Sequence, residues 1–419
     1  MGLLRAHRAT AWVDSKGTHP TGASMPVVAS GGVGRRIAYY RSVMRPQMTQ
    51  KQLADAARVA LGTIRKIERG ERGVTDSTLE AIADALGVDP GRLRVDRLAA
   101  HSRVREALPA LSAVLATYDI PDDGPVRTVP ELRAAVAGAV RWRVGAQYTR
   151  IARDVPDLLS ELARAYNAAP GRLRSELAEL RVMAYRSADA VAFKFGAIDL
   201  SARLIELMRG AVPEVGDPLL AASVAYVRTE TFFAARAHGA GLRALEQALD
   251  TVPSPATAPE IAVRGALHMR AAVIAGRACD ASAAVTHLDE ARALADQVPE
   301  GIYRGTAFGP DSVRTHEVSV AVSLGDQHVS RALIIAAEWK PPNDLPAERR
   351  SGFYIELARA QLWSGLVDDA FESLKVARHI APQHTREHPW VREDAATLRR
   401  LKRADIENLT NFAEWCAAT

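Results

Sequence analysis

The residues with the clearest potential for recognition chemistry lie between positions 49 and 72. Ile64 and Ile67, three residues apart, predict a short helix with one buried face, from which Arg65 and Lys66 point outward. Arginine and lysine donate hydrogen bonds to the edges of DNA bases and to phosphate oxygens. These residue types at this spacing indicate nucleic-acid binding rather than catalysis.

Two short helices joined by a tight turn are expected to position these side chains. Thr49 is the expected N-cap of the first helix, which ends near Ala57, because a threonine hydroxyl can accept a free backbone N–H. The second helix is expected from about Ala60 to Arg69. Its exposed face would fit a DNA major groove. The apolar residues expected to pack the pair are Leu53, Ala54, Ala57, Val59, Ile64 and Ile67.

Four motifs occur in order around this pair. They are G-R-R-I-x-x-x-R (Gly34 to Arg41), T-Q-x-x-L-A (Thr49 to Ala54), I-x-x-I-E-R-G (Ile64 to Gly70) and L-x-x-I-A-D-A-L-G-V (Leu79 to Val88). With these motifs, residues 33 to 97 resemble a helix-turn-helix domain of the Cro/C1, or XRE, repressor family. The resemblance implies a five-helix DNA-binding domain, with further helices at 33–45, 77–86 and 90–95. One departure is Ala60, where the family often has a Ser or Thr cap.

The resemblance also implies the DNA contacts. The residues expected at the base edges are Gln50, Thr63, Arg65 and Lys66, and Leu61 and Gly62 are expected on the same DNA-binding face. Leu61 and Gly62 carry no hydrogen-bonding side chain, so Arg65 and Lys66 are expected to dominate direct readout. The residues expected to contact phosphate are Arg41, Lys51, Arg69 and Arg72. Glu68 is expected to be structural, because the equivalent acid of the family ties the recognition helix to its domain.

Charge and composition support a DNA-binding front and a helical remainder. Residues 31–97 hold 13 Arg and Lys against 8 Asp and Glu, whereas residues 98–419 sum to −2. A positive field therefore lies where phosphate binding requires it. Aromatic residues make up only 5% of the chain and alanine is abundant, so an all-α fold is expected. No strand pair with hairpin chemistry is recognisable.

The chain is expected to have four parts. Residues 1–30 mix Gly, Pro, Ser and Thr and predict a disordered tail. The DNA-binding domain covers 31–97, and a linker helix and loop cover 98–125, where P-D-D-G-P is the clearest linker signal. Residues 126–419 then form helices broken by Pro and Gly at short intervals, about 14 in seven antiparallel pairs. Such a rhythm predicts an α-solenoid.

The segment from Phe353 to Pro382 resembles a tetratricopeptide repeat. Small Ala370 and Ala377 would allow close helix approach, with Leu374 packed between the helices. Together the two halves resemble actinomycete regulators that join an XRE domain to a tetratricopeptide-like sensor, and peptide-pheromone receptors of Gram-positive bacteria. Those receptors often clamp a peptide backbone with Asn side chains, and this chain has only four Asn.

A signal ligand is expected on the concave face of the solenoid. The candidate residues are Tyr226, Arg228, Arg264, His268, Arg314, His316 and Glu356. For each of them taken singly, a helix-surface residue bonded to a neighbour remains the alternative.

Other chemistry is not indicated. No dinucleotide, P-loop, nucleophile-elbow or HExxH motif occurs, so no enzyme, cofactor or metal is expected. His379, His384 and His388 cluster near Pro382, and they are expected in a solvated loop because Pro382 and Pro389 disfavour a helix there. Cys279 and Cys416 lack a CxxC partner, which is typical of a reducing cytoplasm. No apolar run approaches the ~20 residues of a membrane span.

The leading hypothesis is a cytoplasmic, homodimeric transcriptional regulator that binds a double-stranded DNA operator. Its helical domain would dimerise and sense a peptide or a small molecule. One alternative is a protein-interaction scaffold with weak or vestigial DNA binding. Another is a repressor without any ligand.

Overall fold

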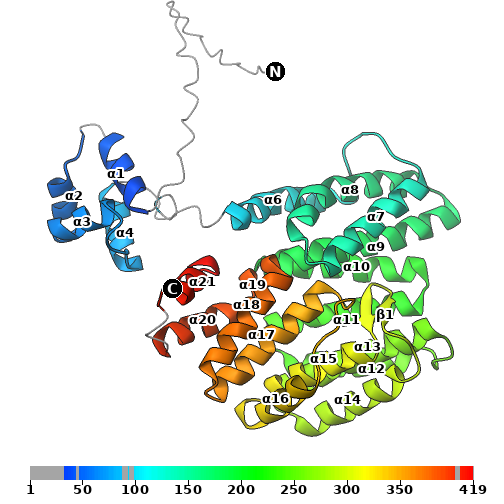
Figure 1. The fold of residues 1–419 in the computed structure, drawn as a ribbon. Helices are drawn as coiled ribbons and strands as arrows, with labels where there is room; N and C mark the ends of the chain where they lie inside the picture. Colours follow the sequence, from blue (N-terminus) through cyan, green and yellow to red (C-terminus); the bar gives the residue numbers. More distant parts are fainter. Residues whose placement is uncertain (1–32, 44–46, 87–92, 94–98, 402–405, 419) are drawn as a thin grey trace, which may run out of the picture. The chain divides into compact units, whose positions relative to one another are not determined.

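The computed structural model describes residues 33–43, 47–86, 93, 99–401 and 406–418, and it is helical almost throughout. The chain divides into two compact units, residues 1–96 and 97–419, here called the small unit and the large unit. Figure 1 shows the elements of each. The predicted all-α class is confirmed.

Four helices of the small unit are described, each near its expected position. They are α1 (Val33–Val43), α2 (Gln50–Ala56), α3 (Leu61–Glu68) and α4 (Asp76–Ala85). Their apolar side chains form a single core, in which Ile37, Leu53, Ile64 and Ile82 are fully buried. The expected tail at 1–30 and the expected helix at 90–95 lie outside the described residues, except for Leu93, which is buried in this core.

The first motif contains a glycine for a steric reason. A Cβ atom at Gly34 would lie 1.8 Å from the carbonyl oxygen of Ile67, so the backbones of α1 and α3 approach as closely as only glycine allows. Gly34 therefore sets how closely α1 packs against the second helix of the predicted pair.

The large unit contains the remaining helices and one short β-hairpin. Its first half consists of α6 (Ala99–Ala116), α7 (Val129–Val144), α8 (Tyr148–Ala168), α9 (Gly171–Lys194), α10 (Ile198–Val215), α11 (Pro218–Ala234), α12 (His238–Thr251), α13 (Ala258–Arg277) and α14 (Ala281–Ala295). Its second half consists of β1 (Gly301–Tyr303), β2 (Thr306–Phe308), α15 (Pro310–Ser323), the 3-10 turn η1 (Asp326–His328), α16 (Val329–Glu338), α17 (Ala347–Trp363), α18 (Val367–Ile380), α19 (Pro382–Glu387), α20 (Pro389–Leu401) and α21 (Ile406–Trp415).

Most of these helices form antiparallel hairpins that stack side by side (Figure 1). One row is formed by α9, α11, α13, α15 and α17, and each of its members contacts the next. The second row is formed by α10, α12, α14, α16 and α18, which pack onto the first. Side chains of the first row therefore face a shared interior.

The segment from Phe353 to Pro382 forms the expected helix pair, α17 and α18. Ala370, Leu374 and Ala377 are buried in one cluster with Ile355 and Ala358 of α17. Small residues on α18 allow this close packing, as their spacing predicted. Similarity to a tetratricopeptide repeat remains a resemblance.

Helix α6 differs from the linker expected at 98–125. It packs against α8 and places Val104, Leu111 and Leu115 in the main core of the large unit. It is therefore the first helix of that unit, and residues 117–128 form the loop that follows it. An amphipathic linker helix and an amphipathic core helix have the same sequence pattern.

The β-hairpin was not expected either. Its strands pair antiparallel, with Gly301 opposite Phe308 and Tyr303 opposite Thr306. The two turn residues, Arg304 and Gly305, have φ of 47° and 76°, the left-handed values that a two-residue hairpin turn needs. Three-residue strands and an Arg-Gly turn give too weak a sequence signal to be recognised.

Candidate functional site

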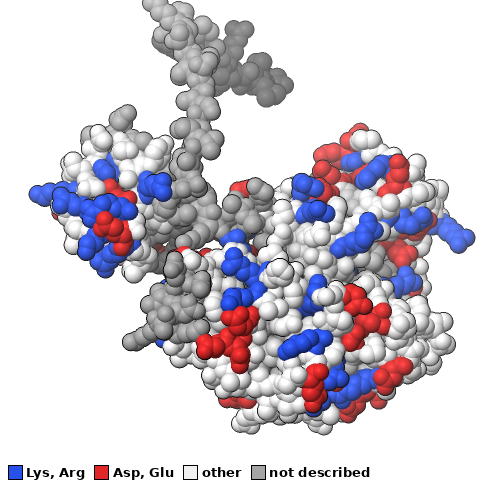
Figure 2. All heavy atoms as spheres, viewed as in Figure 1, with Lys and Arg blue, Asp and Glu red and all other residues white. Residues whose placement is uncertain are grey.

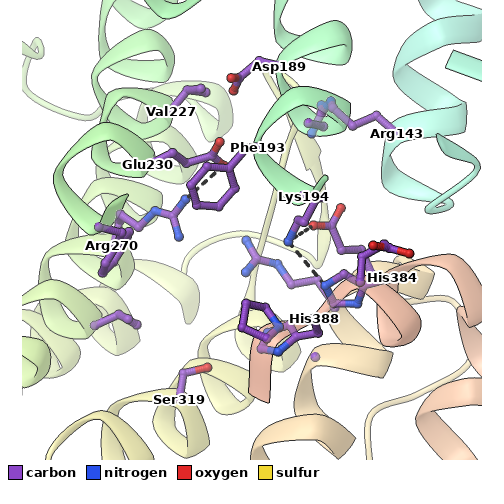
Figure 3. Close-up of a pocket in the computed structure, with 18 of the residues that line it drawn as sticks. Arg143, Asp189, Phe193, Lys194, Val227, Glu230, Arg270, Ser319, His384 and His388 are labelled. Carbon is purple, nitrogen blue, oxygen red and sulfur yellow. Dashed lines mark hydrogen bonds and ion pairs between the residues drawn. The ribbon is translucent and has the colours of Figure 1, made fainter. Parts of the chain in front are cut away.

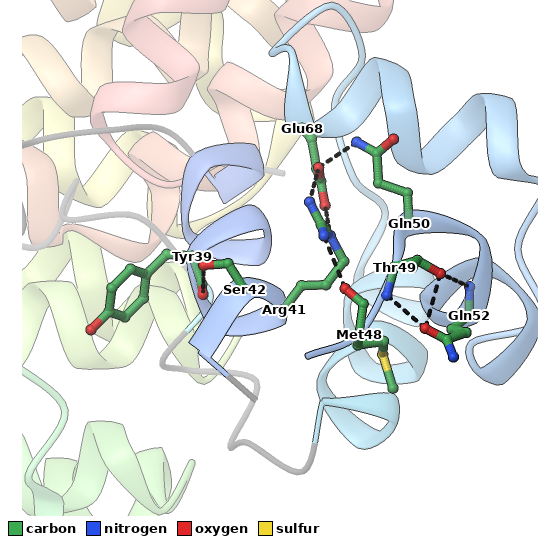
Figure 4. A network of polar contacts seen from close by, with 8 residues as sticks. All are labelled: Tyr39, Arg41, Ser42, Met48, Thr49, Gln50, Gln52 and Glu68. Carbon is green, nitrogen blue, oxygen red and sulfur yellow. Dashed lines mark hydrogen bonds and ion pairs between the residues drawn. The ribbon is translucent and has the colours of Figure 1, made fainter. Parts of the chain in front are cut away.

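The first candidate site is the face formed by α2 and α3. Thr49 caps α2 reciprocally, since its backbone N–H donates to Gln52 Oε1 at 2.8 Å and its hydroxyl accepts from the Gln52 N–H at 3.2 Å (Figure 4). Arg58 turns the chain with a positive φ of 52°. Helix α3 then begins at Leu61 after Ala60, which supplies no side-chain cap. The turn is thus fixed mainly from the α2 side.

Glu68 joins three elements of the small unit (Figure 4). Arg41 donates to its two oxygens at 2.8 and 3.0 Å, and Gln50 donates to Oε2 at 2.6 Å. Arg41 also donates to the carbonyl of Met48 at 3.0 Å. The hydrogen bonds that Arg41 donates to Glu68 raise the pKa of Arg41 above its ordinary value. The structural role expected for Glu68 agrees with this geometry.

This network involves two residues that are expected to contact DNA. The Arg41 side chain, expected to contact phosphate, is only 16% exposed and is paired with Glu68 inside the unit. The amide nitrogen of Gln50 is held by Glu68, which leaves its carbonyl oxygen for a base. The pairing of Arg41 in α1 with Glu68 in α3 could not be anticipated from spacing, because the two residues lie 27 positions apart.

The other predicted contacts lie on the surface of the small unit. Arg65, Lys66, Lys51 and Gly62 are exposed, while Leu61 and Thr63 are half-buried. Arg69 pairs with exposed Glu71 at 2.7 Å, and Arg72 donates weakly to Thr63 Oγ1 at 3.5 Å. Arg65 and Lys51 form no hydrogen bond or ion pair with another described residue. These two cations are therefore available to an external anion.

Figure 2 shows Lys and Arg side chains over much of the visible face of the small unit. Among the described residues of the whole small unit, the exposed cations are Arg35, Lys51, Arg58, Arg65, Lys66, Arg69 and Arg72, and the exposed acids are Asp55, Glu71, Glu80 and Asp84. Such an excess favours a polyanion as partner.

The decisive comparison concerns this unit. Residues 47–93 match the family described as helix-turn-helix, HTH_3. The chain is also 36% identical over 74 residues to transcriptional regulator ClgR of Mycobacterium tuberculosis, in strain CDC 1551 and in strain H37Rv alike. That match covers 17% of this chain and 66% of the relative, so the likeness to ClgR concerns only a small part of the chain. The helix-turn-helix assignment thus covers α2, α3 and α4.

The second candidate site is a cavity of ≈ 960 Å³ that is lined by residues of the large unit. Its walls come from α7, from the row α9, α11, α13, α15 and α17, from α19 and α20, and from the tip of the β-hairpin. Figure 3 shows Arg143, Lys194, Glu230 and Arg270, from four of these helices, around one space. Several helices that are distant in sequence therefore build one polar chamber.

Three of the seven predicted ligand residues line this cavity. Tyr226, His316 and Glu356 are among its wall residues. His316 Nδ1 contacts the Ser312 carbonyl at 2.8 Å, and its Nε2 lies 2.9 Å from Arg349. Burial lowers the pKa of His316 well below its usual value, so this imidazole is neutral at physiological pH.

The other four predicted ligand residues are not among the residues that line this cavity. Arg228 stacks over Phe232 at 5.1 Å, and Arg264 donates to the Leu249 carbonyl at 3.1 Å. His268 contacts His287 at 3.0 Å, and Arg314 stacks over Trp339 at 5.8 Å. Each contacts a neighbouring residue, although Arg314 Nε has no hydrogen-bond partner within the described parts of the chain.

The histidines near Pro382 correct another expectation. His384 and His388 lie at the buried wall of the cavity, on or just after α19, rather than in a solvated loop. His384 Nδ1 is 2.7 Å from Ser351 Oγ, and its Nε2 is 3.3 Å from Lys194 Nζ. Burial lowers the pKa of His384 to about 3, so its ring is neutral. His379 is exposed at the end of α18.

Sequence reasoning missed all of the Arg and Lys residues that line the cavity. Arg143, Arg186, Lys194, Arg270 and Arg349 all line it. Burial opposes ionisation of Glu348, but Lys194, 2.9 Å away, outweighs it and lowers the pKa of Glu348 to about 2. Burial raises the pKa of Glu356 to about 7. A search for basic residues at the spacing of the inner helix faces would have found part of this set.

Two further observations concern the cysteines and the possibility of a membrane-spanning helix. Cys279 is exposed and Cys416 is buried, and neither forms a disulfide. Within the described parts of the chain, no helix is long and apolar enough to cross a membrane.

Proposed function

We propose that this protein is a sequence-specific DNA-binding transcriptional regulator that works as a homodimer in the cytoplasm, with a large unit that senses a small signal molecule. The observation that carries the DNA-binding part is the pair Arg65 and Lys66, exposed on the second helix of a matched helix-turn-helix. The likeness to a transcriptional regulator over 74 residues supports it. We propose no catalytic role.

We propose a dimer because of the small surface that one DNA-binding module can bury on DNA. A single small module buries little surface on DNA, and helix-turn-helix proteins reach useful affinity by binding two half-sites with two copies. The large unit contributes tetratricopeptide-like hairpins in this proposal, and its stacked helices are the natural element to join two copies. The operator then has two half-sites about one or more helical turns apart.

Sensing is supported by the polar cavity. Buried charged groups are costly to fold around, and a chamber this rich in them has a functional rather than a packing explanation. A ligand bound there would favour one arrangement of the two DNA-binding units over others, and so change their fit to the half-sites.

The first experiment is a footprint of the full-length protein on its own upstream DNA across a salt series. The proposal expects a protected pair of half-sites whose affinity falls steeply with salt. Arg65→Ala should weaken and relax this footprint, while Arg209→Ala, an exposed arginine of α10, should leave it unchanged. If the upstream region gives no footprint, selection from random DNA sequences replaces it as the target.

The scaffold alternative keeps one specific observation in its favour. Leu61 and Gly62 begin α3 without any side-chain hydrogen-bonding group, which leaves the start of the recognition helix chemically bare. A scaffold would retard all DNA weakly and alike, and random-site selection would then enrich no sequence.

A further inference from the structure

The cavity of the large unit has one chemically distinct end. We propose that Arg186, Arg270 and Arg349 form an anion subsite around Tyr226, which binds the carboxylate or phosphate group of a small organic ligand. This inference rests on the proposed sensing function and names the chemical class of the signal.

Four helices bring these residues together. The guanidinium carbons of Arg270 and Arg186 lie 4.5 and 5.9 Å from the centre of the Tyr226 ring. Arg349 Nη2 donates to the Tyr226 hydroxyl at 3.2 Å. The cations come from α9, α13 and α17, and the tyrosine comes from α11 between them. Three like charges are thus held around one aromatic ring.

Among the described residues, no carboxylate lies within hydrogen-bond distance of the three arginines of this subsite, although Glu348 and Glu300 act on Arg349, and Glu230 and Asp189 on Arg186, at longer range. Arg186 donates to neutral acceptors, the Arg304 carbonyl at 2.8 Å and Thr306 Oγ1 at 2.6 Å. Arg349 donates to Tyr226 and contacts His316, also neutral. Arg270 has one acid, Glu230, at 3.7 Å, beyond hydrogen-bond distance. Arginine binds a carboxylate or a phosphate strongly because it can donate two parallel hydrogen bonds to the anion. In this subsite the arginine donors have weaker acceptors instead.

The acids of the cavity do not cancel this charge. Nine Arg and Lys line the cavity against five Asp and Glu. Burial and the nearby Glu230 hold the pKa of Asp189 well above its usual range, which disfavours the charged form of this carboxyl. Glu348 is engaged by Lys194 at 2.9 Å. The chamber therefore has an excess of positive charge that a bound anion would neutralise.

Buried donors also remain without acceptors. Arg270 Nε and Arg143 Nε are buried and have no hydrogen-bond partner in the described structure. Leaving such groups unpaired destabilises the folded state, and an anion supplies the missing acceptors. The Arg143 donor lies on α7, next to the hairpin tip, so the positive region extends across the cavity.

The walls beside the arginines are partly apolar. Phe193, Val227, Phe233, Val273 and Phe353 line the same cavity. Its volume of ≈ 960 Å³ lies within the range of sites for drug-sized ligands. A bound molecule therefore has an anionic group and an apolar body, rather than charge alone.

The test uses the full-length protein and defined probes. Isothermal titration and thermal unfolding are measured with citrate, inorganic phosphate and pyrophosphate, against chloride at constant ionic strength. Saturable binding of at least one probe that raises the unfolding temperature is expected. Citrate alone would mark a carboxylate site, and either phosphate alone a phosphate site. No saturable binding of any of the three would overturn the proposal.

Variants locate the subsite. Arg270→Gln and Arg349→Gln should each weaken binding by about tenfold or more, the loss expected for one charge-assisted hydrogen bond or ion contact. Arg331→Gln, an exposed arginine of α16, should bind as the wild type does. Equal affinity in all three variants would place the anion elsewhere and reject the subsite.

A measurement on the wild type covers variants that fail to fold. An anion among Arg186, Arg270 and Arg349 reduces the field of these arginines on Tyr226. The other charged groups near Tyr226 include Arg143 of α7, which also interacts with the phenol, and Glu230 on the same helix as Tyr226. Ionisation of the Tyr226 phenol should then shift to higher pH when the probe binds, and an unchanged titration would contradict the proposal. Footprinting without any probe tests the DNA-binding function separately. Failure of the anion subsite would therefore not contradict DNA binding, and failure of DNA binding would not contradict the subsite.

Discussion

The guanidinium of Arg41 and the carboxylate of Glu68 form a two-point ion pair, 2.8 and 3.0 Å long, between the first and third helices of the helix-turn-helix unit. Both side chains are largely shielded from water. The pair fixes the helix that carries Arg65 and Lys66 to the rest of the unit, and it gives Gln50 an anchor on the same carboxylate.

Breaking this pair should loosen the recognition helix. Glu68→Gln leaves Arg41 with a weaker acceptor, and loss of one partner from a shielded pair costs about 3 kcal/mol. We expect DNA affinity to fall for all sequences alike, while the unfolding of the large unit is unchanged. Denaturation followed by circular dichroism, together with DNA titration, measures both. Unaltered DNA affinity would show that the pair does not position α3.

Arg65 and Arg72 should differ in what they recognise. Arg65→Ala is expected to cost about 1–3 kcal/mol of binding free energy and to relax selectivity at one base step. Arg72→Ala should weaken binding to all sequences and lower the salt slope by about 1. Binding titrations on the operator and on single-base variants, over a salt series, distinguish them. Identical behaviour of the two variants would remove Arg65 from base readout.

Gly34 and Gly62 offer a matched pair of glycine-to-alanine substitutions. A Cβ at Gly34 would meet the Ile67 carbonyl oxygen at 1.8 Å, whereas a Cβ at Gly62 has nothing within 4 Å. Gly34→Ala should therefore destabilise the small unit by several kcal/mol. Gly62→Ala should stabilise α3 by about 1 kcal/mol, because alanine favours helix. Calorimetry of both full-length variants decides, and equal midpoints would disprove the close approach.

Tyr226 should ionise at unusually low pH. Burial opposes ionisation of its phenol, but Arg270, Arg349 and Arg186 outweigh this and lower the pKa of Tyr226 to about 8. Because the folded-state pKa lies below that of the unfolded chain, its stabilising effect should grow as pH rises from about 8 to about 10 and be lost as pH falls through 8. Ultraviolet titration should show one early phenol that is missing in Tyr226→Phe. Persistence of that early transition in the variant would assign it to another tyrosine.

The position of the Phe308 ring should depend on Gly265 in α13. A Cβ at Gly265 would lie 1.9 Å from the Phe308 ring, which is fully buried. Gly265→Ala should displace the β-hairpin and weaken binding of the anionic probes, with DNA binding in their absence unchanged. Limited proteolysis near residue 304 would report the displacement. Wild-type cleavage and binding would mean that Phe308 moves aside at no cost.

Sequence reasoning worked where local pattern decides the structure. The three-residue spacing of Ile64 and Ile67 and the Thr49 cap were enough to place α2 and α3. The pairing of Arg41 with Glu68 was not accessible, because it depends on how α1 crosses α3. The three-residue hairpin strands carried no usable period.

The cavity was harder to predict because inner helices have two kinds of buried face. At 3.6 residues per turn, Arg264 and Arg270 lie about 120° apart around α13, and only Arg270 reaches the cavity. The sequence indicates that α13 is a helix, but it does not indicate which face of that helix the neighbouring hairpins cover. Arg186 and Arg349 were missed for the same reason, as their positions depend on packing among α9, α11 and α17.

The tip of the β-hairpin has a consequence for unfolding. Gly305 accepts from Arg143 at 2.6 Å, 162 residues earlier, and Arg304 is bonded to Arg186 and paired with Glu179 and Asp217. Arrays in which each hairpin contacts only its neighbours melt progressively from their ends. Here the hairpin turn contacts helices at both the start and the middle of the array. We therefore expect α7 to α13 to lose their structure in a single cooperative step.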